Sequence, residues 1–226
     1  MEENQLQSRE LSLVEKVTRN ARIIVRTRWT PYRLSRAACA ESADQKWVEL
    51  AALAHLVRQT KPQWTMEIGI YEGGTIGLWA QMMPAQGTLI GIDLKLSKGV
   101  EERIRLKMKP GQNLHLLELD SHSLETRMQL TNILGENRVD FLFIDGDHSY
   151  KGVRQDFEDY SPLVRPGGIV AFHDIIPCVP DHSGPEAESQ SIEVSQFWGE
   201  IKSRFPHREF VEDRAQGCCG IGVLQF

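Results

Sequence analysis

The stretch VDFLFIDGDHSYKGVRQDFEDY, residues 139–160, decides the fold class of this chain. Five of the six residues in Val139–Ile144 are apolar, a pattern typical of a short strand that is buried on both faces. The chain then turns abruptly through Asp145, Asp147 and His148 before a helical pattern begins. In open α/β sheets, ligands bind just outside the carboxyl ends of the strands. The stretch therefore predicts a buried strand that ends in a functional site.

Strand and helix patterns alternate along most of the chain. Alternating strands and helices imply right-handed crossovers and a parallel sheet that is covered on both faces. The last two strand patterns have no helix between them, which predicts an antiparallel hairpin at one edge. We therefore expect an α/β fold with a Rossmann-like, doubly wound, seven-stranded and mostly parallel sheet. The predicted strands are 64–70, 87–94, 113–120, 139–145, 168–175, 208–213 and 220–226, and the predicted helices are 44–60, 75–83, 98–108, 123–134, 152–164 and 194–205.

Composition and charge exclude several classes of function. The chain is 41% hydrophobic and 25% charged, as in an ordinary globular protein, and its formal net charge of -5 gives no general attraction to nucleic acid. No apolar run approaches the ~20 residues that cross a bilayer, and the polar start predicts no secretory signal. The cysteines show no zinc or CxxC spacing, so we expect reduced thiols and a cytoplasmic protein. These cysteines are Cys39, Cys178, Cys218 and Cys219.

Residues 1–43 form a predicted helical arm that precedes a main domain of residues 44–226. The arm has a partly helical apolar rhythm and becomes basic around Arg22, Arg26 and Arg33. One interpretation is a solvated helix that docks on the core or on a second subunit of a homo-oligomer. The other is a cover over an anionic or carboxylate-bearing ligand.

A glycine-rich turn joins the first predicted strand to the next helix. Gly69 and Gly73 in MEIGIYEGGT, residues 66–75, let the backbone turn tightly and approach a ligand closely. The dinucleotide fingerprint needs a glycine where Tyr71 stands, because a side chain there would crowd a pyrophosphate on the helix N-terminus. The turn therefore fits NAD or FAD poorly.

Acidic residues end the second and third predicted strands. From the end of GIDL, the Asp93 carboxylate can accept hydrogen bonds from both ribose hydroxyls of a nucleoside, at roughly 1.5–3 kcal/mol each. Asp120 and Ser121 in ELDSHS can meet the edge of an adenine. Structural alternatives exist for each acid, since Asp93 and Asp120 can also cap helices and Glu67 can pair with an arginine of the arm. Together, at successive strand ends, the acids indicate a nucleoside site.

These motifs resemble those of class I S-adenosylmethionine-dependent methyltransferases of the small-molecule type, near the cephalosporin hydroxylase and macrocin O-methyltransferase groups. The resemblance covers about residues 60–226 and rests most on FIDGDHSYKGVRQDFEDYSPLVRPGGIVAFHDI, residues 143–175. It implies S-adenosylmethionine as cofactor, with Glu67 near its methionine end and Asp93 on its ribose. Tyr71 departs from the commonest glycine pattern of the class. The implied cofactor-binding residues are Glu67, Gly69, Tyr71, Gly73, Thr75, Asp93, Asp120, Ser121 and Asp145.

The fourth and fifth predicted strands bring a second set of polar residues together. Asp145 and His148 follow one strand, His173 and Asp174 end the other, and Asp with His at such spacing suits Mg²⁺ or another divalent ion. By the resemblance, Asp145 and Asp174 match metal-ligand positions. His173 stands at the third position, where many relatives have an oxygen ligand, so either a softer metal binds or none does.

The resemblance also places a base three residues beyond Asp145, at His148. Its ordinary pKa of about 6.5 suits proton transfer at neutral pH. Tyr150 is a lesser candidate for orienting the acceptor, and Asp145 completes the predicted catalytic set. The alternative is that His148 and His173 hydrogen-bond the turn and serve the fold alone.

The expected function is methyl transfer to a hydroxyl or amine of a small molecule, a sugar or an antibiotic in natural-product biosynthesis. The polar loop at residues 177–191 is either a solvated segment or, with its acids, a wall for a cationic acceptor. Two other functions compete with this one. The chain can be an NAD-dependent oxidoreductase, which Tyr71 disfavours, or a nucleoside-binding protein without catalysis, which the intact acid and histidine set disfavours.

Overall fold

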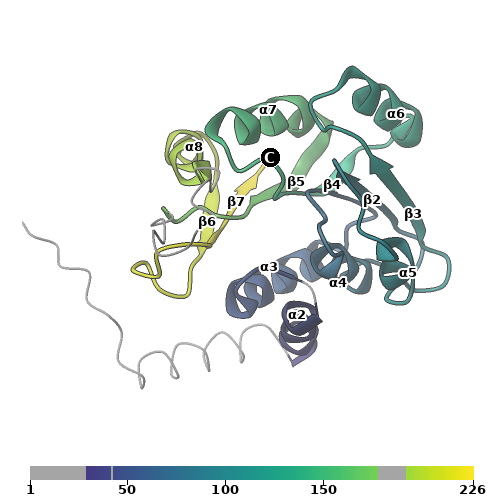
Figure 1. Ribbon diagram of the computed structural model, residues 1–226, viewed down its shortest axis with the longest axis horizontal. Helices are drawn as coiled ribbons and strands as arrows, with labels where there is room; N and C mark the ends of the chain where they lie inside the picture. Colours follow the sequence, from purple (N-terminus) through teal and green to yellow (C-terminus); the bar gives the residue numbers. More distant parts are fainter. Residues whose placement is uncertain (1–28, 42, 178–191) are drawn as a thin grey trace, which may run out of the picture.

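The computed structural model describes residues 29–41, 43–177 and 192–226, and a seven-stranded sheet runs through this part of the chain (Figure 1). The strand order is β3-β2-β1-β4-β5-β7-β6, and β7 runs antiparallel to both of its neighbours. The predicted fold, with its C-terminal hairpin, is confirmed. The strands are β1 Trp64–Ile68, β2 Thr88–Asp93, β3 Asn113–Glu118, β4 Val139–Ile144, β5 Val164–Phe172, β6 His207–Phe210 and β7 Ile221–Gln225.

Helices cover both faces of this sheet (Figure 1). One layer consists of α2 Trp29–Glu41, α3 Trp47–Thr60, α4 Gly74–Met82 and α5 Val100–Arg105, and the other of α6 Leu124–Leu134, α7 Tyr150–Tyr160 and α8 Val194–Ile201. Each layer packs its apolar side chains against one face of the sheet and forms a separate hydrophobic core. The polar residues at the strand ends lie outside these cores and are available for a binding site.

Strand β4 shows why the sheet is buried on both faces. Successive side chains of a strand point to opposite faces. Phe141 and Phe143 therefore pack on Trp79 of α4, with ring centroids 5.0 and 5.6 Å from the indole, while Leu142 and Ile144 join the core beneath α6–α8. All four side chains are at most 2% exposed. Burying a side chain of this size contributes roughly 1.5–3 kcal/mol, so β4 anchors both layers.

The turn after β4 is fixed by capping bonds. The Ser149 hydroxyl accepts a hydrogen bond from Gly152 N at 3.0 Å, which starts α7, and Glu193 N donates to the His148 carbonyl at 2.8 Å. The helix predicted at 152–164 in fact ends at Tyr160. Because Pro162 has no N–H, the chain continues as a short 3-10 turn, Ser161–Leu163, and β5 begins at Val164.

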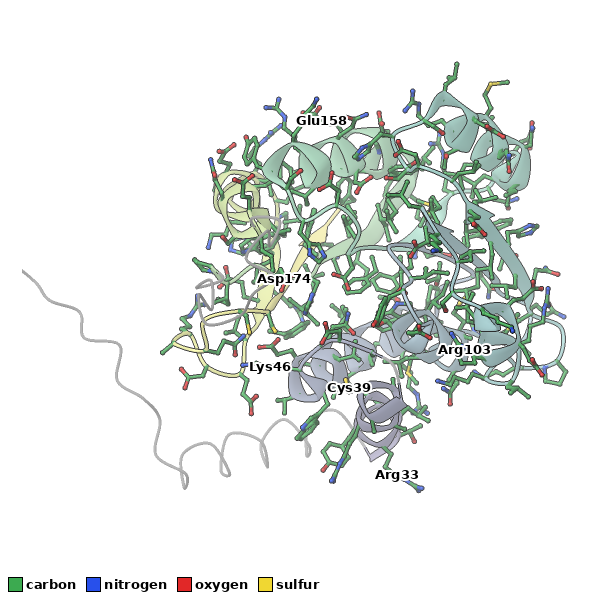
Figure 2. The ribbon with its side chains drawn as sticks, in the orientation of Figure 1. Arg33, Cys39, Lys46, Arg103, Glu158 and Asp174 are labelled. Atoms are coloured by element: carbon green, nitrogen blue, oxygen red, sulfur yellow. The ribbon has the colours of Figure 1, made fainter. Side chains whose placement is uncertain are left out.

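Helix α2 packs against α3 and α4, where the Tyr32 and Trp47 rings meet edge to face at 5.1 Å. Figure 2 shows Arg33 on the outer side of α2 and Asp174 deep between the two helix layers. Residues 1–28 and 178–191 lie outside the described residues, so assembly through the arm and the acidic wall stay predictions. Among the helices of residues 29–41, 43–177 and 192–226, none is long and apolar enough to cross a membrane.

The turn after β1 leads to a test of the fold. Gly69 has a φ of 81°, and a Cβ at this position would lie 2.1 Å from the Asp145 carbonyl oxygen. We expect Gly69→Ala to lower the free energy of unfolding by roughly 2–5 kcal/mol, through backbone strain and the clash. Urea unfolding measures this loss.

The matched control is Gly199→Ala in α8, where nothing lies within 4 Å of the added methyl group. It should leave stability unchanged or raise it slightly, because alanine favours helix. Equal effects of the two substitutions would contradict the close approach of Gly69 to β4.

Candidate functional site

A cavity of about 720 Å³ opens at the carboxyl ends of the parallel strands. Its walls come from the turns after β1, β2, β3, β4 and β5, from the residues just before α3, α8 and β7, and from Thr75 of α4. Its volume lies within the range of small-molecule sites, roughly 300–1,000 Å³. The cavity therefore stands where the sequence places a ligand.

The cavity wall is strongly acidic. Among the described residues that line it, lysine is represented by Lys95 alone and arginine is absent, and the histidines are His148 and His173. A concave wall of one charge sign attracts ligands of the opposite sign and repels those of the same sign. The site thus favours a cationic ligand over a pyrophosphate. The acids are Asp44, Glu67, Glu72, Asp93, Asp145, Asp147 and Asp174.

Asp93 is tied to the glycine turn. Its Oδ2 accepts hydrogen bonds from Ile70 N and Tyr71 N, both at 2.9 Å, and its Oδ1 accepts one from Lys95 N at 3.0 Å. Carboxylate oxygens have about two acceptor positions each. Oδ1 therefore keeps one position for a ligand hydroxyl, and Asp93 shapes the turn as well as lining the cavity.

Glu67 lies at the floor of the cavity and is 1% exposed. Its Oε2 has no hydrogen-bond partner among the described residues. Burial, followed by the nearby Asp145 carboxylate, raises the pKa of Glu67 well above its ordinary range. A cation beside Glu67 would favour its ionised form, which is a further reason to expect a positively charged ligand group here.

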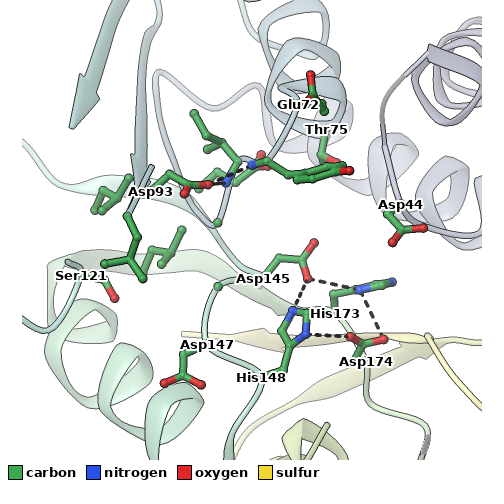
Figure 3. A pocket seen from close by; sticks show the side chains of 18 of the residues that line it. Asp44, Glu72, Thr75, Asp93, Ser121, Asp145, Asp147, His148, His173 and Asp174 are labelled. Atoms are coloured by element: carbon green, nitrogen blue, oxygen red, sulfur yellow. Dashed lines mark hydrogen bonds and ion pairs between the residues drawn. The ribbon is translucent and has the colours of Figure 1, made fainter. Parts of the chain in front are cut away.

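Asp145 contacts three side chains, and Figure 3 shows two of them, His148 and His173. Gln45 Nε2 donates to its Oδ2 at 2.7 Å, while His148 Nε2 and His173 Nδ1 lie 3.4 and 3.2 Å from its Oδ1. Burial alone would raise the pKa of Asp145, but the two histidines outweigh it and hold the pKa below its ordinary value. Asp145 is therefore a carboxylate whose charge these contacts compensate.

The two histidines differ in exposure. The His148 side chain is 34% exposed, and its hydrogen bond to Asp145 raises its pKa above the ordinary value. The His173 side chain is 6% exposed. Burial would lower the pKa of His173, but Asp145 and Asp174 raise it well above the ordinary value. Since His148 is the more accessible, it is the better placed to exchange a proton with a ligand.

Other predicted site residues point elsewhere. Asp120 is exposed and its Oδ1 accepts a hydrogen bond from His122 N at 2.9 Å, although its neighbour Ser121 lines the cavity. Tyr150 OH donates to Glu200 at 2.8 Å, away from the cavity. Gly73 lies under α5, where an added Cβ would meet Val100. Gly69, Tyr71 and Thr75 do line the cavity.

Sequence patterns missed Gln45, Glu49 and Cys219. Gln45 accepts a hydrogen bond from Thr75 Oγ1 at 2.8 Å while it donates to Asp145, so it links α4 to the β4 end. Glu49 and Cys219 shape the wall before β7. These three residues belong to no sequence motif. Each acts through contacts with residues that are distant in the sequence. The one sequence signal for Gln45 was its position as a polar residue just before α3.

The residues around Asp145 do not form the all-oxygen set that Mg²⁺ prefers. Asp145 Oδ1 and Asp174 Oδ1 lie 3.2 and 3.4 Å from the same atom, His173 Nδ1, so an imidazole stands between the carboxylates. His148 adds two more nitrogens within 3.8 Å of these acids. The nitrogen-rich set fits Mg²⁺ poorly.

Comparison with known proteins adds a family. Residues 66–175 match the family model of a methyltransferase domain. This match covers 110 of the 226 residues, just under half of the chain. A protein of Acanthamoeba polyphaga mimivirus, described as uncharacterized protein R132, is 35% identical over 113 residues, which are 48% of this chain and 50% of that protein. The chain thus matches half the length of this relative.

Solved structures share the fold of the methyltransferase domain. The O-methyltransferase TomG of Streptomyces achromogenes, in complex with SAM, is 17% identical with a TM-score of 0.58, over 93% of this chain and 94% of TomG. The MycE methyltransferase of the mycinamycin biosynthetic pathway, with Mg and SAH, is 18% identical with a TM-score of 0.56, over 86% of this chain and 53% of MycE. These likenesses show the class I methyltransferase fold.

A buried ionisable pair lies beside the Ser121 wall of the cavity. Asp156 of α7 is fully buried, and its Oδ1 lies 3.1 Å from His122 Nε2. Burial is the largest cause that raises the pKa of Asp156 to about 6, against opposing contacts with Ser121 and His122. Because the folded pKa lies above the unfolded value, the stability from the neutral acid is fully present below about pH 4 and is lost as pH rises through 6.

This pair makes the stability of the protein depend on pH. Between pH 4.5 and 7.5 the wild-type protein should lose ~2 kcal/mol of unfolding free energy relative to Asp156→Asn, which has no ionisable group at this position. Urea unfolding of both proteins at the two pH values measures the difference. Parallel changes in the two proteins would show that Asp156 does not ionise in this window.

Proposed function

We propose that this chain is an S-adenosylmethionine-dependent methyltransferase that methylates a hydroxyl or amine of a small molecule. The observation that carries the proposal is the acidic cavity at the carboxyl ends of the strands of a methyltransferase domain. S-adenosylmethionine carries a sulfonium and an ammonium group, both cationic, whereas NAD carries a pyrophosphate. The charge of the wall supports the first cofactor and opposes the second.

The residues present fit an adenosyl cofactor. Asp93 Oδ1 keeps an acceptor position for a ribose hydroxyl, and the Ser121 wall can receive the adenine. The buried Glu67 carboxyl, which has an unpartnered oxygen among the described residues, can accept from the ammonium group. When bound, the cofactor supplies a sulfonium-activated methyl group. The protein itself has to hold the acceptor in line with that methyl group and remove one proton.

We assign that proton transfer to His148. His148 Nε2 lies 3.4 Å from Asp145 Oδ1, so a proton on Nε2 points at this carboxylate. Nδ1 then carries the lone pair, and it lies 3.8 Å from Asp174 Oδ2, which is too far for a hydrogen bond. Nδ1 can take the acceptor proton, and the Asp174 carboxylate stabilises the imidazolium that forms. The arrangement matches the base-and-orienter geometry of general-base catalysis.

Support for a small natural product as the acceptor is indirect. TomG is described as involved in tomaymycin synthesis, and MycE belongs to the mycinamycin pathway. The acidic wall also suits an acceptor with an amino group, such as an amino sugar. An acceptor screen with labelled S-adenosylmethionine should therefore begin with amino sugars and amine-bearing antibiotics.

Cofactor binding tests the role of Asp93. Asp93→Asn keeps a carbonyl oxygen for the backbone N–H groups of Ile70 and Tyr71 but removes the charge. We expect it to weaken the binding of S-adenosylhomocysteine roughly 10–100-fold, the loss of one hydrogen bond to a charged acceptor, as measured by calorimetry.

Glu118→Gln is the matched control. Glu118 lies on β3 directly beside Asp93 of β2, but it is exposed and lies outside the cavity. This variant should bind S-adenosylhomocysteine as tightly as the wild type does. If both variants bind as tightly as the wild type, Asp93 does not hold the ribose.

Turnover tests the role of His148. His148→Ala should lower the rate of methyl transfer by roughly 10²–10⁴-fold while S-adenosylhomocysteine affinity changes little. Wild-type activity should rise with pH through a pKa above 6.5, because Asp145 favours the protonated imidazole and the base must be neutral.

His207→Ala, on the exposed edge strand β6, is the control and should retain full activity. Turnover near the wild-type rate in His148→Ala, or an acid limb below pH 6.5, would remove His148 as the base.

A further inference from the structure

The two ring nitrogens of His173 have different surroundings. Nδ1 faces Asp145 Oδ1 at 3.2 Å and Asp174 Oδ1 at 3.4 Å, so its proton is held by carboxylates. Nε2 is buried and has no hydrogen-bond partner among the described residues. A buried polar atom left unsatisfied costs roughly 1–3 kcal/mol. In the neutral ring, the N–H at Nδ1 faces the carboxylates and Nε2 carries the lone pair, which is the usual arrangement of a metal ligand. Because the carboxylates favour the protonated ring, an ion at Nε2 has to displace a proton.

The Cys219 thiol stands next to this histidine. The donor atoms of His173, Asp174 and Cys219 all lie within 4.8 Å of one another. Four protein or solvent ligands in a tetrahedron, at bond lengths of ~2.0–2.3 Å, are separated by ~3.3–3.8 Å. The three donors are therefore close enough to reach one ion after small side-chain rotations. Asp174 and Cys219 also line the cavity, which leaves the fourth ligand position open to it.

The backbone conformation that places Cys219 beside His173 is strained. Ile176 N donates to the Cys219 carbonyl at 2.9 Å, and Ile175 N donates to the Gly220 carbonyl at 3.3 Å, so the chain before β7 is bonded to the chain after β5. Asp174 and Cys219 adopt φ values of 60° and 63°, in the left-handed region. A non-glycine residue there costs of order 1–3 kcal/mol and persists when the surroundings impose it.

A buried carboxylate of helix α3 holds the loop in this conformation. Glu49 of α3 is 1% exposed, and its Oε2 accepts a hydrogen bond from Gly220 N at 2.9 Å. Its Oε1 accepts from Gln216 Nε2 at 2.9 Å, and the same amide donates to the Cys218 carbonyl at 2.7 Å. The loop that carries Cys219 is thus anchored on both sides of the cysteine.

We propose that His173, Asp174 and Cys219 form a binding site for a zinc-type transition-metal ion, with an open position facing the cavity. Nitrogen, oxygen and sulfur donors suit zinc and its neighbours and do not suit Mg²⁺. Sequence spacing gave no zinc motif because two ligands follow β5 and the third precedes β7. The site goes beyond methyl transfer, but it shares Asp174 with it, because the same carboxylate faces His148. Co²⁺ binding to the chain without cofactor or acceptor tests the site separately from the proposed function.

Cobalt(II) titration of the full, reduced chain tests the site. A thiolate bound to Co²⁺ gives an intense charge-transfer band in the near ultraviolet, which reports sulfur ligation directly. We expect this band to saturate at one Co²⁺ per chain, to disappear when Zn²⁺ displaces the cobalt, and to survive excess Mg²⁺. Cys219→Ser should abolish the band and weaken Co²⁺ binding at least about tenfold, with the fold checked by circular dichroism.

Cys218→Ser is the matched control, because its sulfur lies only 3.2 Å from that of Cys219. Cys218→Ser and Cys178→Ser, made as separate variants, should both keep the charge-transfer band. Absence of the band in the folded wild-type protein, or its survival in Cys219→Ser, would overturn the proposal. Should Cys219→Ser fail to fold, Asp174→Asn provides the second test. It should keep the thiolate band and lower Co²⁺ affinity at least about tenfold, and unchanged affinity would exclude Asp174 as a ligand.

Discussion

The negative charge of Asp145 is the constraint on which the site depends. A carboxylate removed from water is costly unless it is paired and hydrogen-bonded. Its charge is compensated by Gln45 just before α3, by His148 just before α7 and by His173 just after β5. Three separate elements thus converge on one residue at the end of β4. Asp145 therefore orients the proposed base, His148, and also ties together the chain segments around the end of β4.

The parallel sheet makes this convergence geometrically natural. Because β1, β4 and β5 run in the same direction, their carboxyl ends meet at one edge, and the side chains that follow them share one cavity. The helix layers close the two faces with apolar side chains, and polar groups gather where the strands stop. The result is a cavity lined by many carboxyl groups, and burial and Asp145 raise the pKa of one of them, Glu67. Such a wall attracts cationic ligands and repels anionic ones.

Much of this could be predicted from the sequence. The apolar run of Val139–Ile144 and the acids after it identified β4 and its site, because burial and strand ends are local patterns. Gln45, Glu49 and Cys219 could not be predicted, because each acts through contacts across the fold. Motif position also does not say where a side chain points. Asp120 caps its own turn and Tyr150 bonds Glu200, which no pattern distinguishes from pocket-facing residues.

Thermal unfolding with S-adenosylhomocysteine or with NAD tests the central claim, that the acidic cavity is an adenosyl-cofactor site, most directly. A ligand at 100 times its Kd adds ~2.7 kcal/mol to the stability of the folded state. For a chain of this size, S-adenosylhomocysteine should raise the Tm by roughly 5–10 °C. NAD should leave the Tm unchanged, because its pyrophosphate meets the acidic wall. A shift with NAD, or with neither ligand, would contradict the account.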